Sequence, residues 1–178
     1  MNQSPLAPSK RLLELFPNLL TPPPQGEEQF FLRFNLDESQ LGLIPIEAVK
    51  ETLLIETEKI TPIPNMPLAC LGLMNARDEV FPVIDLSIAL GIGQNPQSTR
   101  KYQVIVIDIQ PHLPDTQLLG LIVPQIQGFS KFQTVEISEL SSASNSNLDT
   151  AVQGVLTLDN EDYWILDVSQ LNKLPSLQ

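Results

Sequence analysis

A stretch of glycine, apolar residues and aspartate occurs twice in the chain with the same spacing, and this repeat constrains the fold more than any other feature. In the first copy, apolar runs flank the charged residues 77–79, and thirteen positions separate Gly72 from Asp85. In the second copy, thirteen positions separate Gly154 from Asp167. Two apolar runs around a short polar turn are typical of a β-hairpin. The chain is therefore predicted to contain two copies of one β unit.

A second repeat widens the duplicated unit beyond the hairpin. Residues 41–44 (Leu-Gly-Leu-Ile) return as residues 119–122, so Gly42 corresponds to Gly120. Strand-length runs separated by proline and glycine leave few places for a long helix. We expect an all-β protein with a few short helices, in which two small β-barrels form a pseudo-duplicated arrangement.

Composition divides the chain into a tail and one folded domain. Residues 1–27 hold a leucine-bearing segment, 11–20, and a proline-rich spacer of the kind that stiffens a linker into an extended form. Residues 28–174 carry the repeats, with the first barrel expected at about 37–98 and the second at about 99–160. We leave open that the ends of the domain cross between the barrels. The tail either packs on its own domain or inserts into a groove of a partner.

Local patterns predict the remaining elements. Residues 47–53 are expected to form a short helix before a strand, and residues 86–91 a second short helix that ends at a glycine. Residues 102–109 are apolar on both faces, which is typical of an interior strand. Serine and asparagine dominate residues 138–150, which favours a mobile surface loop.

The charge of the chain limits its partners. Ten basic residues stand against twenty-one acidic ones, and the formal net charge is −11. This balance removes the electrostatic term that drives most nucleic-acid binding and opposes docking on anionic lipid. The sequence also shows no signal peptide and no apolar run long enough to span a bilayer. We expect a cytoplasmic protein.

Few residues are candidates for chemistry. His112, the only histidine, has no second histidine near it and is expected to lie on the surface, while Cys70 is expected to be a small core residue. One aspartate from each repeat, Asp85 and Asp167, is a conceivable hydrolase dyad. Each of them also precedes a predicted helical turn, which favours a helix N-cap. We expect no catalytic residue, no metal and no cofactor.

Arg77 has two interpretations. It is either a solvated turn charge, paired with a neighbouring acidic residue for less than about 1 kcal/mol, or a recognition group. The planar fork of a guanidinium suits specific contacts, and arginine is enriched at the centres of protein interfaces. The residues alone leave both interpretations open.

Five segments follow one another in an order that identifies a family: residues 31–36, 41–51, 60–67, 71–77 and 81–86. They closely resemble the CheW-like domain of chemotaxis coupling proteins, and the resemblance covers about residues 28–174. Its most specific part is the element Gly72-x-x-Asn75-x-Arg77 joined to Pro82-Val83-Ile84-Asp85-Leu86.

The resemblance implies a fold, a function and a site. The fold is a pair of five-stranded, SH3-like β-barrels. The function is that of a non-catalytic cytoplasmic scaffold in a membrane-associated signalling array, which joins the regulatory domain of a CheA-type histidine kinase to the cytoplasmic tip of methyl-accepting receptors. Five positions match the partner-contacting region of the family: Val49, Glu51, Gly72, Asn75 and Arg77. Six positions match its fold-determining motif: Gly42, Pro82, Asp85, Gly120, Gly154 and Asp167.

Three positions depart from the family pattern. Asp78 stands where the family usually has glycine, Ser87 replaces a frequent arginine, and Pro124 replaces a frequent acidic residue. Together with the long tail, these departures suggest a divergent paralogue. The alternative function is therefore that of an adaptor in a pilus-motility or phototaxis pathway, with partners other than receptors.

Overall fold

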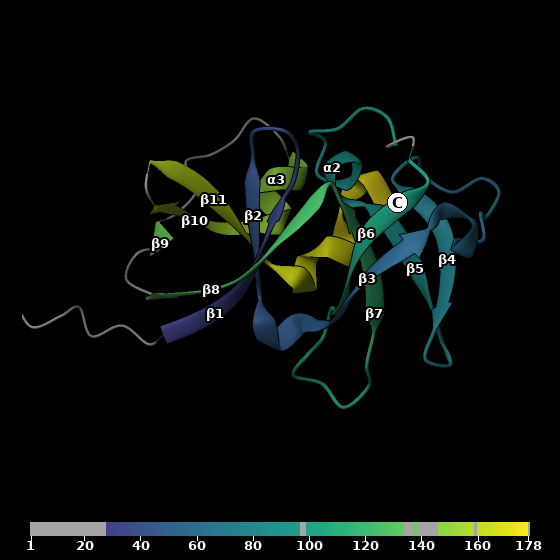
Figure 1. Ribbon diagram of the computed structural model, residues 1–178, viewed down its shortest axis with the longest axis horizontal. Helices are drawn as coiled ribbons and strands as arrows, with labels where there is room; N and C mark the ends of the chain where they lie inside the picture. The colour runs from purple at the N-terminus through teal and green to yellow at the C-terminus, as the bar shows by residue number, and fades with distance from the viewer. Residues whose placement is uncertain (1–27, 97–98, 134–136, 139–145, 159, 178) are drawn as a thin grey trace, which may run out of the picture.

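The computed structural model describes residues 28–177 except for 97–98, 134–136, 139–145 and 159, so the predicted tail lies outside the described residues. The strands form two sheets, which lie side by side in Figure 1. The six-stranded sheet has the order β8 (Gln125–Gln133), β1 (Glu28–Asn35), β2 (Leu41–Pro45), β11 (Glu161–Leu166), β10 (Val152–Leu158) and β9 (Ile137–Ser138). The five-stranded sheet has the order β3 (Val49–Glu56), β6 (Lys101–Asp108), β7 (Leu118–Val123), β5 (Glu79–Asp85) and β4 (Cys70–Ala76).

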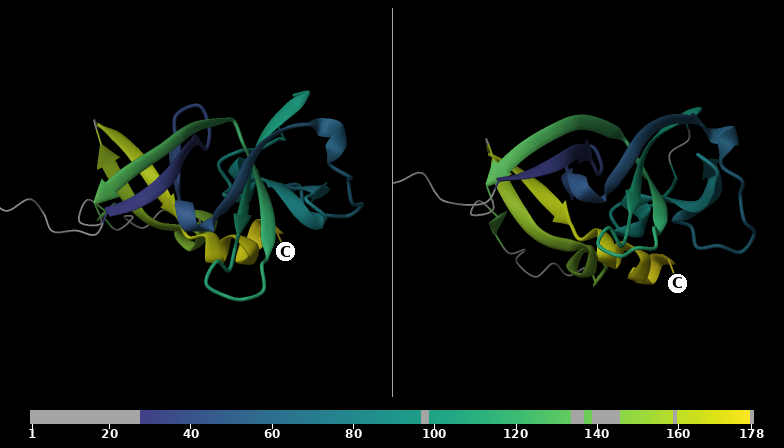
Figure 2. Two further views of the ribbon diagram at one scale, coloured as in Figure 1. Left: turned by 60° about the horizontal axis from the view of Figure 1, so that its bottom comes forward. Right: turned by 90° about the horizontal axis from the view of Figure 1, so that it is seen from below.

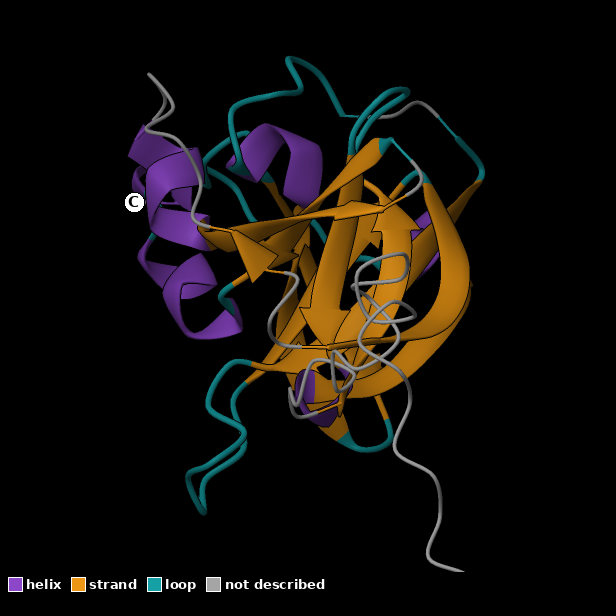
Figure 3. Ribbon diagram, turned by 90° about the vertical axis from the view of Figure 1, so that its left-hand side faces the viewer, coloured by secondary structure: helices purple, strands orange, loops and turns teal. Residues whose placement is uncertain are grey.

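The helices are short, and most of them gather on one side of the strands (Figure 3). The α-helices are α2 (Leu86–Ala89) and α3 (Ser146–Ala151). Four 3-10 turns complete the described structure: η2 (Ile46–Ala48), η3 (Thr57–Lys59), η5 (Val168–Lys173) and η6 (Pro175–Leu177). Within the described part of the chain, none of these helices has the length and apolar character needed to cross a bilayer.

The predicted fold class is confirmed, and the two sheets show how the duplication is built. The first two strands, β1 and β2, pair with the later strands β8 and β11, whereas β6 and β7 pair with the earlier strands β3 and β5. The parallel contacts β2–β11 and β5–β7 occupy equivalent places in the two sheets. Each half of the sequence thus gives a two-strand unit to the sheet of the other half. Figure 2 shows the two sheets, and the chain that passes between them, from two further sides.

This exchange corrects the predicted barrel boundaries. Strands β6 and β7, placed in the second barrel, belong to the sheet of β3–β5, and β2 belongs to the sheet of β10 and β11. The chain crosses between the sheets at η2 and at Pro124. The predicted boundary at about residue 98 does not separate the barrels, because it falls between β5 and β6, which are strands of the same sheet. A sequence repeat reveals equivalent strands, but it does not show which copy each strand pairs with.

Two further expectations are wrong. Residues 49–53 form part of β3 and not a helix, because their burial alternates with period two along a strand that pairs with β6. The predicted loop 138–150 contains most of α3, because Leu148 inserts its side chain into the core. The part of this loop at 139–145 lies outside the described residues. Strand β8, which we did not predict, carries Gly128 near its middle, and its burial alternates along most of its length.

Three apolar clusters hold the fold together. One fills the five-stranded barrel and includes Met74, Phe81 and Val104, and another fills the other barrel and includes Phe31 and Tyr163. The largest cluster lies between the sheets and takes residues from both of them and from α2, α3 and η5. The barrels therefore share a common core, to which the interior strand β6 contributes as predicted.

Candidate partner-binding site

The hairpin between β4 and β5 turns at Arg77 and Asp78, whose φ angles are 51° and 66°. Ala76 pairs with Glu79 at the end of the ladder, so the turn has two residues. Two central residues with positive φ are typical of a type I′ turn, which matches the twist of the flanking strands and favours asparagine and glycine. Asp78 adopts a positive φ although it stands where the family usually has glycine. Arg77 is thus presented from a tightly defined backbone.

Glu51 holds the guanidinium of Arg77. The Nη2 atom of Arg77 lies 2.9 Å from Oε2 of Glu51, and the two side chains are 79% and 16% exposed. Glu51 lies on β3 and Arg77 follows β4, so the ion pair joins the two outer strands of the five-stranded sheet. Because Glu51 is mostly buried, its side chain has little freedom to move. Arg77 is therefore oriented although it is exposed.

Lys50 forms a second ion pair, which the sequence did not indicate. Its Nζ atom lies 3.3 Å from Oδ2 of Asp108, whose side chain is 3% exposed. The other oxygen, Oδ1, accepts hydrogen bonds from the backbone N–H groups of Gln110 at 3.0 Å and Gln117 at 3.2 Å. Burial alone would raise the pKa of Asp108, but these hydrogen bonds and the charge of Lys50 outweigh it and lower the pKa below its ordinary value. No sequence pattern marks this pair, because it depends on the register of β3 against β6.

A hollow of about 290 Å³ lies beside the two ion pairs. It is lined by Lys50, Glu51, Ala76, Arg77, Glu79, Val106, Thr116 and Leu118. A neighbouring hollow of about 500 Å³ shares three of these residues and adds Val80 and Pro82, which are exposed. We call these two hollows and the turn at residues 77–78 the hairpin surface. It combines oriented charges with apolar area, as protein interfaces do.

The structure separates the other predicted contact residues from Arg77. Asn75 is exposed and lines a different hollow, of about 530 Å³, between β3 and β4. Val49 is half-buried and packs against the core between the sheets. Gly72 lies five residues before Arg77, about 16 Å along a strand. Of the five candidates, Glu51 and Arg77 are the two that an ion pair joins.

Gly72 has a role in the backbone. Its φ is 145°, and a Cβ atom at this position would overlap the carbonyl oxygen of Thr61. Thr61 exchanges two hydrogen bonds with Leu73, of 2.7 and 2.9 Å. A glycine is required here because the connector 57–69 crosses β4 at close range. The equivalent Gly154 lies, like Gly72, beside a register shift in its hairpin.

The aspartates of the repeat cap helical turns, as predicted. Asp85 is 2% exposed, and its Oδ1 accepts hydrogen bonds from the backbone N–H groups of Ser87 at 3.1 Å and Ile88 at 3.3 Å. Oδ1 of Asp167 accepts one from the N–H of Ser169 at 3.0 Å. Each carboxylate is engaged at the start of its own turn, and these contacts give the hydrolase alternative no support.

The remaining motif residues lie at strand contacts. Gly42 pairs with Trp164 and Gly120 pairs with Val83, each across the parallel contact of its sheet. Pro82 is exposed on β5. Among the described residues, no group of three or more histidine, cysteine, aspartate and glutamate side chains is placed to hold a metal ion.

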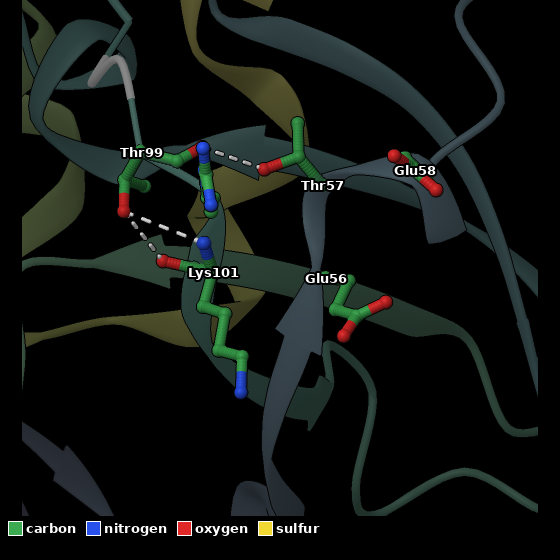
Figure 4. Close-up of a pocket in the computed structure, with 6 residues that line it drawn as sticks. Glu56, Thr57, Glu58, Thr99 and Lys101 are labelled. Atoms are coloured by element: carbon green, nitrogen blue, oxygen red, sulfur yellow. Dashed lines mark hydrogen bonds between the residues drawn. The ribbon is translucent and has the colours of Figure 1, made fainter.

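A larger hollow, of about 600 Å³, lies at the far end of β3 from Val49 (Figure 4). Two glutamates, Glu56 and Glu58, line it together with Arg100 and Lys101. The hydroxyl of Thr57 donates to the carbonyl of Thr99 at 2.7 Å, so it is used within the fold. The mixed charges favour no ligand of one sign, and we assign the hollow no function.

The fold and the hairpin surface define a class: a double β-barrel binding module with a charged, partly apolar surface at one hairpin. The chain belongs to the CheW-like domain family, whose family model matches residues 31–174. It is 22% identical over 111 residues to the chemotaxis protein CheW of Rhizobium meliloti (strain 1021), which covers 62% of this chain and 68% of that protein. The scaffolding protein TtCheW from Thermoanaerobacter tengcongensis has the same fold, with a TM-score of 0.70 and 24% identity over 84% of this chain and 96% of that one.

Proposed function

We propose that the chain is a non-catalytic adaptor that couples a CheA-type histidine kinase to methyl-accepting receptors on the cytoplasmic side of a membrane. Membership of the CheW-like domain family supports this proposal. The observation that carries the site is the ion pair of Arg77 with Glu51, in which an exposed cation is oriented by a mostly buried carboxylate. Such a cation loses less conformational freedom on binding than a mobile side chain would.

The hairpin surface provides the chemistry for one of these contacts. The fork of Arg77 has five N–H donors, and Glu51 uses only part of them, so the rest are available to a partner carboxylate or carbonyl. Val80, at 63% exposure, supplies apolar area beside the charges. The partner segment that fits combines an acidic or amide group with apolar side chains. Val49, Gly72 and Asn75 remain candidate contacts from the family resemblance, with Asn75 the most accessible of the three.

The two barrels offer the geometry of a scaffold. Because they share a core, partners bound to different barrels are held in a defined relative orientation. Each interface of such a complex need only be near or below about 800 Å² per partner. A small shift at one partner can then bias the other, provided that each partner distinguishes two states.

Charge reversal at Arg77 tests the proposed site. Arg77→Glu places two carboxylates side by side and should weaken binding of a cognate receptor tip or kinase regulatory domain by about 2 kcal/mol, roughly 30-fold. Lys131→Glu is the matched control, because Lys131 is also an exposed cation paired with a glutamate, Glu28, at 2.8 Å. Affinity is measured by titration calorimetry, and the thermal midpoint should change little because exposed pairs contribute less than about 1 kcal/mol.

The outcomes separate the function from the site. Binding by the wild type together with unchanged binding by Arg77→Glu would reduce Arg77 to a turn charge, while the coupling function stands. Failure of the wild type to bind either cognate domain would refute the coupling function itself. An equal loss in Arg77→Glu and Lys131→Glu would indicate a general charge effect.

A further inference from the structure

Two exposed aromatic side chains lie together on the six-stranded sheet. Phe30 on β1 is 53% exposed, and Phe129 on β8 is 63% exposed. Phe30 pairs with Lys131, and Leu32 pairs with Phe129, in an antiparallel ladder. Residues that oppose one another in such a ladder share a face, and diagonal neighbours lie within reach of aromatic side chains. Phe30 and Phe129 therefore form one apolar patch, which we call the aromatic patch.

The aromatic patch continues the core of the protein. On the same face of β1, Leu32 and Phe34 are 1% and 0% exposed, and both belong to the cluster between the sheets. Nearer the start of β1, the same face is exposed to solvent at Phe30. Strand β8 is also an outer strand, with no neighbour on its far side among the described residues. The patch thus joins an apolar surface to an open strand edge, a combination that proteins usually cover.

We propose that the segment 11–20 of the same chain covers the aromatic patch. Six of its ten residues have large apolar side chains: Leu12, Leu13, Leu15, Phe16, Leu19 and Leu20. The described structure begins at Glu28, two residues before Phe30, so the patch lies where the preceding chain joins the domain. The apolar segment and the apolar patch are thus adjacent along the chain.

The length of the spacer fits this contact. The seven residues 21–27 include three consecutive prolines and span about 20 Å when extended. From Glu28 to Leu32, which pairs with Phe129, the distance along β1 is about 13 Å. A short tether raises the effective concentration of the segment at the patch to the millimolar range. The contact is therefore intramolecular, and it is independent of the proposed coupling function.

Disulfide trapping tests this contact in the full chain. Cys70→Ala removes the native thiol, and Asn18→Cys is combined with Lys131→Cys, which places a thiol beside both phenylalanines. The control combines Asn18→Cys with Thr52→Cys, an exposed strand position on the other sheet. In a glutathione buffer, we expect the first pair to form an intramolecular disulfide with an effective molarity at least tenfold above the control. Equal effective molarities, or a covalent dimer in place of the monomer, would overturn the proposal.

A dye-binding measurement tests the same contact without cysteines. Leu15→Asp combined with Phe16→Asp should uncover the patch and raise the fluorescence of bound anilinonaphthalene sulfonate at least threefold. Adding Phe129→Ser should abolish the rise, whereas adding Leu54→Ser should not, although Leu54 is 66% exposed. Circular dichroism verifies that each variant is folded. No rise, or a rise that survives Phe129→Ser, would show that the segment does not cover the aromatic patch.

Discussion

Gly72→Ala should destabilise the fold much more than the same substitution at an exposed glycine would. The φ of 145° is strained for any L-residue, and the new methyl group would overlap the backbone at Thr61. Thr61 and Leu73 would have to separate, which weakens both of the hydrogen bonds that they exchange. The connector 57–69 would then lose its attachment to β4.

The magnitude follows from these contacts. Positive φ costs a residue with a Cβ atom about 1–2 kcal/mol, and two weakened hydrogen bonds cost about 1 kcal/mol each, so Gly72→Ala should cost about 3–4 kcal/mol. Gly128→Ala is the matched control, because Gly128 has a φ of 116° but a Cβ atom added there would meet no other atom within 4 Å. It should cost only the strain, about 1–2 kcal/mol.

Urea unfolding followed by circular dichroism measures both free energies of unfolding. Comparison at equal denaturant slope ensures that the same surface is exposed in each variant. The expected difference between the two variants is about 2 kcal/mol. Losses that agree within about 0.5 kcal/mol would refute the close approach to Thr61 as the reason for glycine, since strain alone would then explain both variants.

Two further predictions concern aspartates whose carboxylates accept hydrogen bonds from backbone N–H groups. The pKa of Asp108 is lowered from its ordinary 3.8, so the ionised carboxylate stabilises the fold above about pH 4, and this contribution is lost as the pH falls through the folded-state pKa. The difference in unfolding free energy between the wild type and Asp108→Asn should therefore shrink between about pH 5 and pH 2. A difference that stays constant over this range would contradict the prediction. Asp85→Ala and Asp167→Ala should each lower the free energy of unfolding in urea by about 1 kcal/mol, because each removes a helix cap. An unchanged free energy of unfolding would show that the caps do not stabilise the fold.

Local features of the fold were predictable from the sequence. The Gly-to-Asp spacing predicts a hairpin followed by a capped turn, and both depend on residues close in the chain, such as Asp85 and Ser87. The exchange of strands was not predictable from the repeat. Gly42 and Gly120 would be equivalent positions whether their strands paired within one half of the sequence or between the halves. Only the contacts of Gly42 with Trp164 and Gly120 with Val83 reveal it.

The candidate site was predictable to a similar extent. Charged residues between two apolar runs indicate a turn that projects Arg77, and the resemblance to the CheW-like domain adds Glu51. The contact between them is a consequence of strand order, because β3 and β4 are the two outer strands of one sheet. The pair of Lys50 with Asp108 spans 58 positions and depends on one register, so no local pattern could indicate it.

The exchanged strands also bear on how an adaptor of this kind could work. If each half of the sequence formed its own barrel, one linker would join the barrels and they could move independently. Here the chain crosses between the sheets at η2 and again at Pro124, and β1 and β6 contribute to the shared core from opposite sheets. Separating the barrels would therefore expose the largest apolar cluster of the protein, at a cost of about 25 cal/mol for each Å² of apolar surface. A partner bound at the hairpin surface, as we propose, would thus act on a body whose two barrels move together.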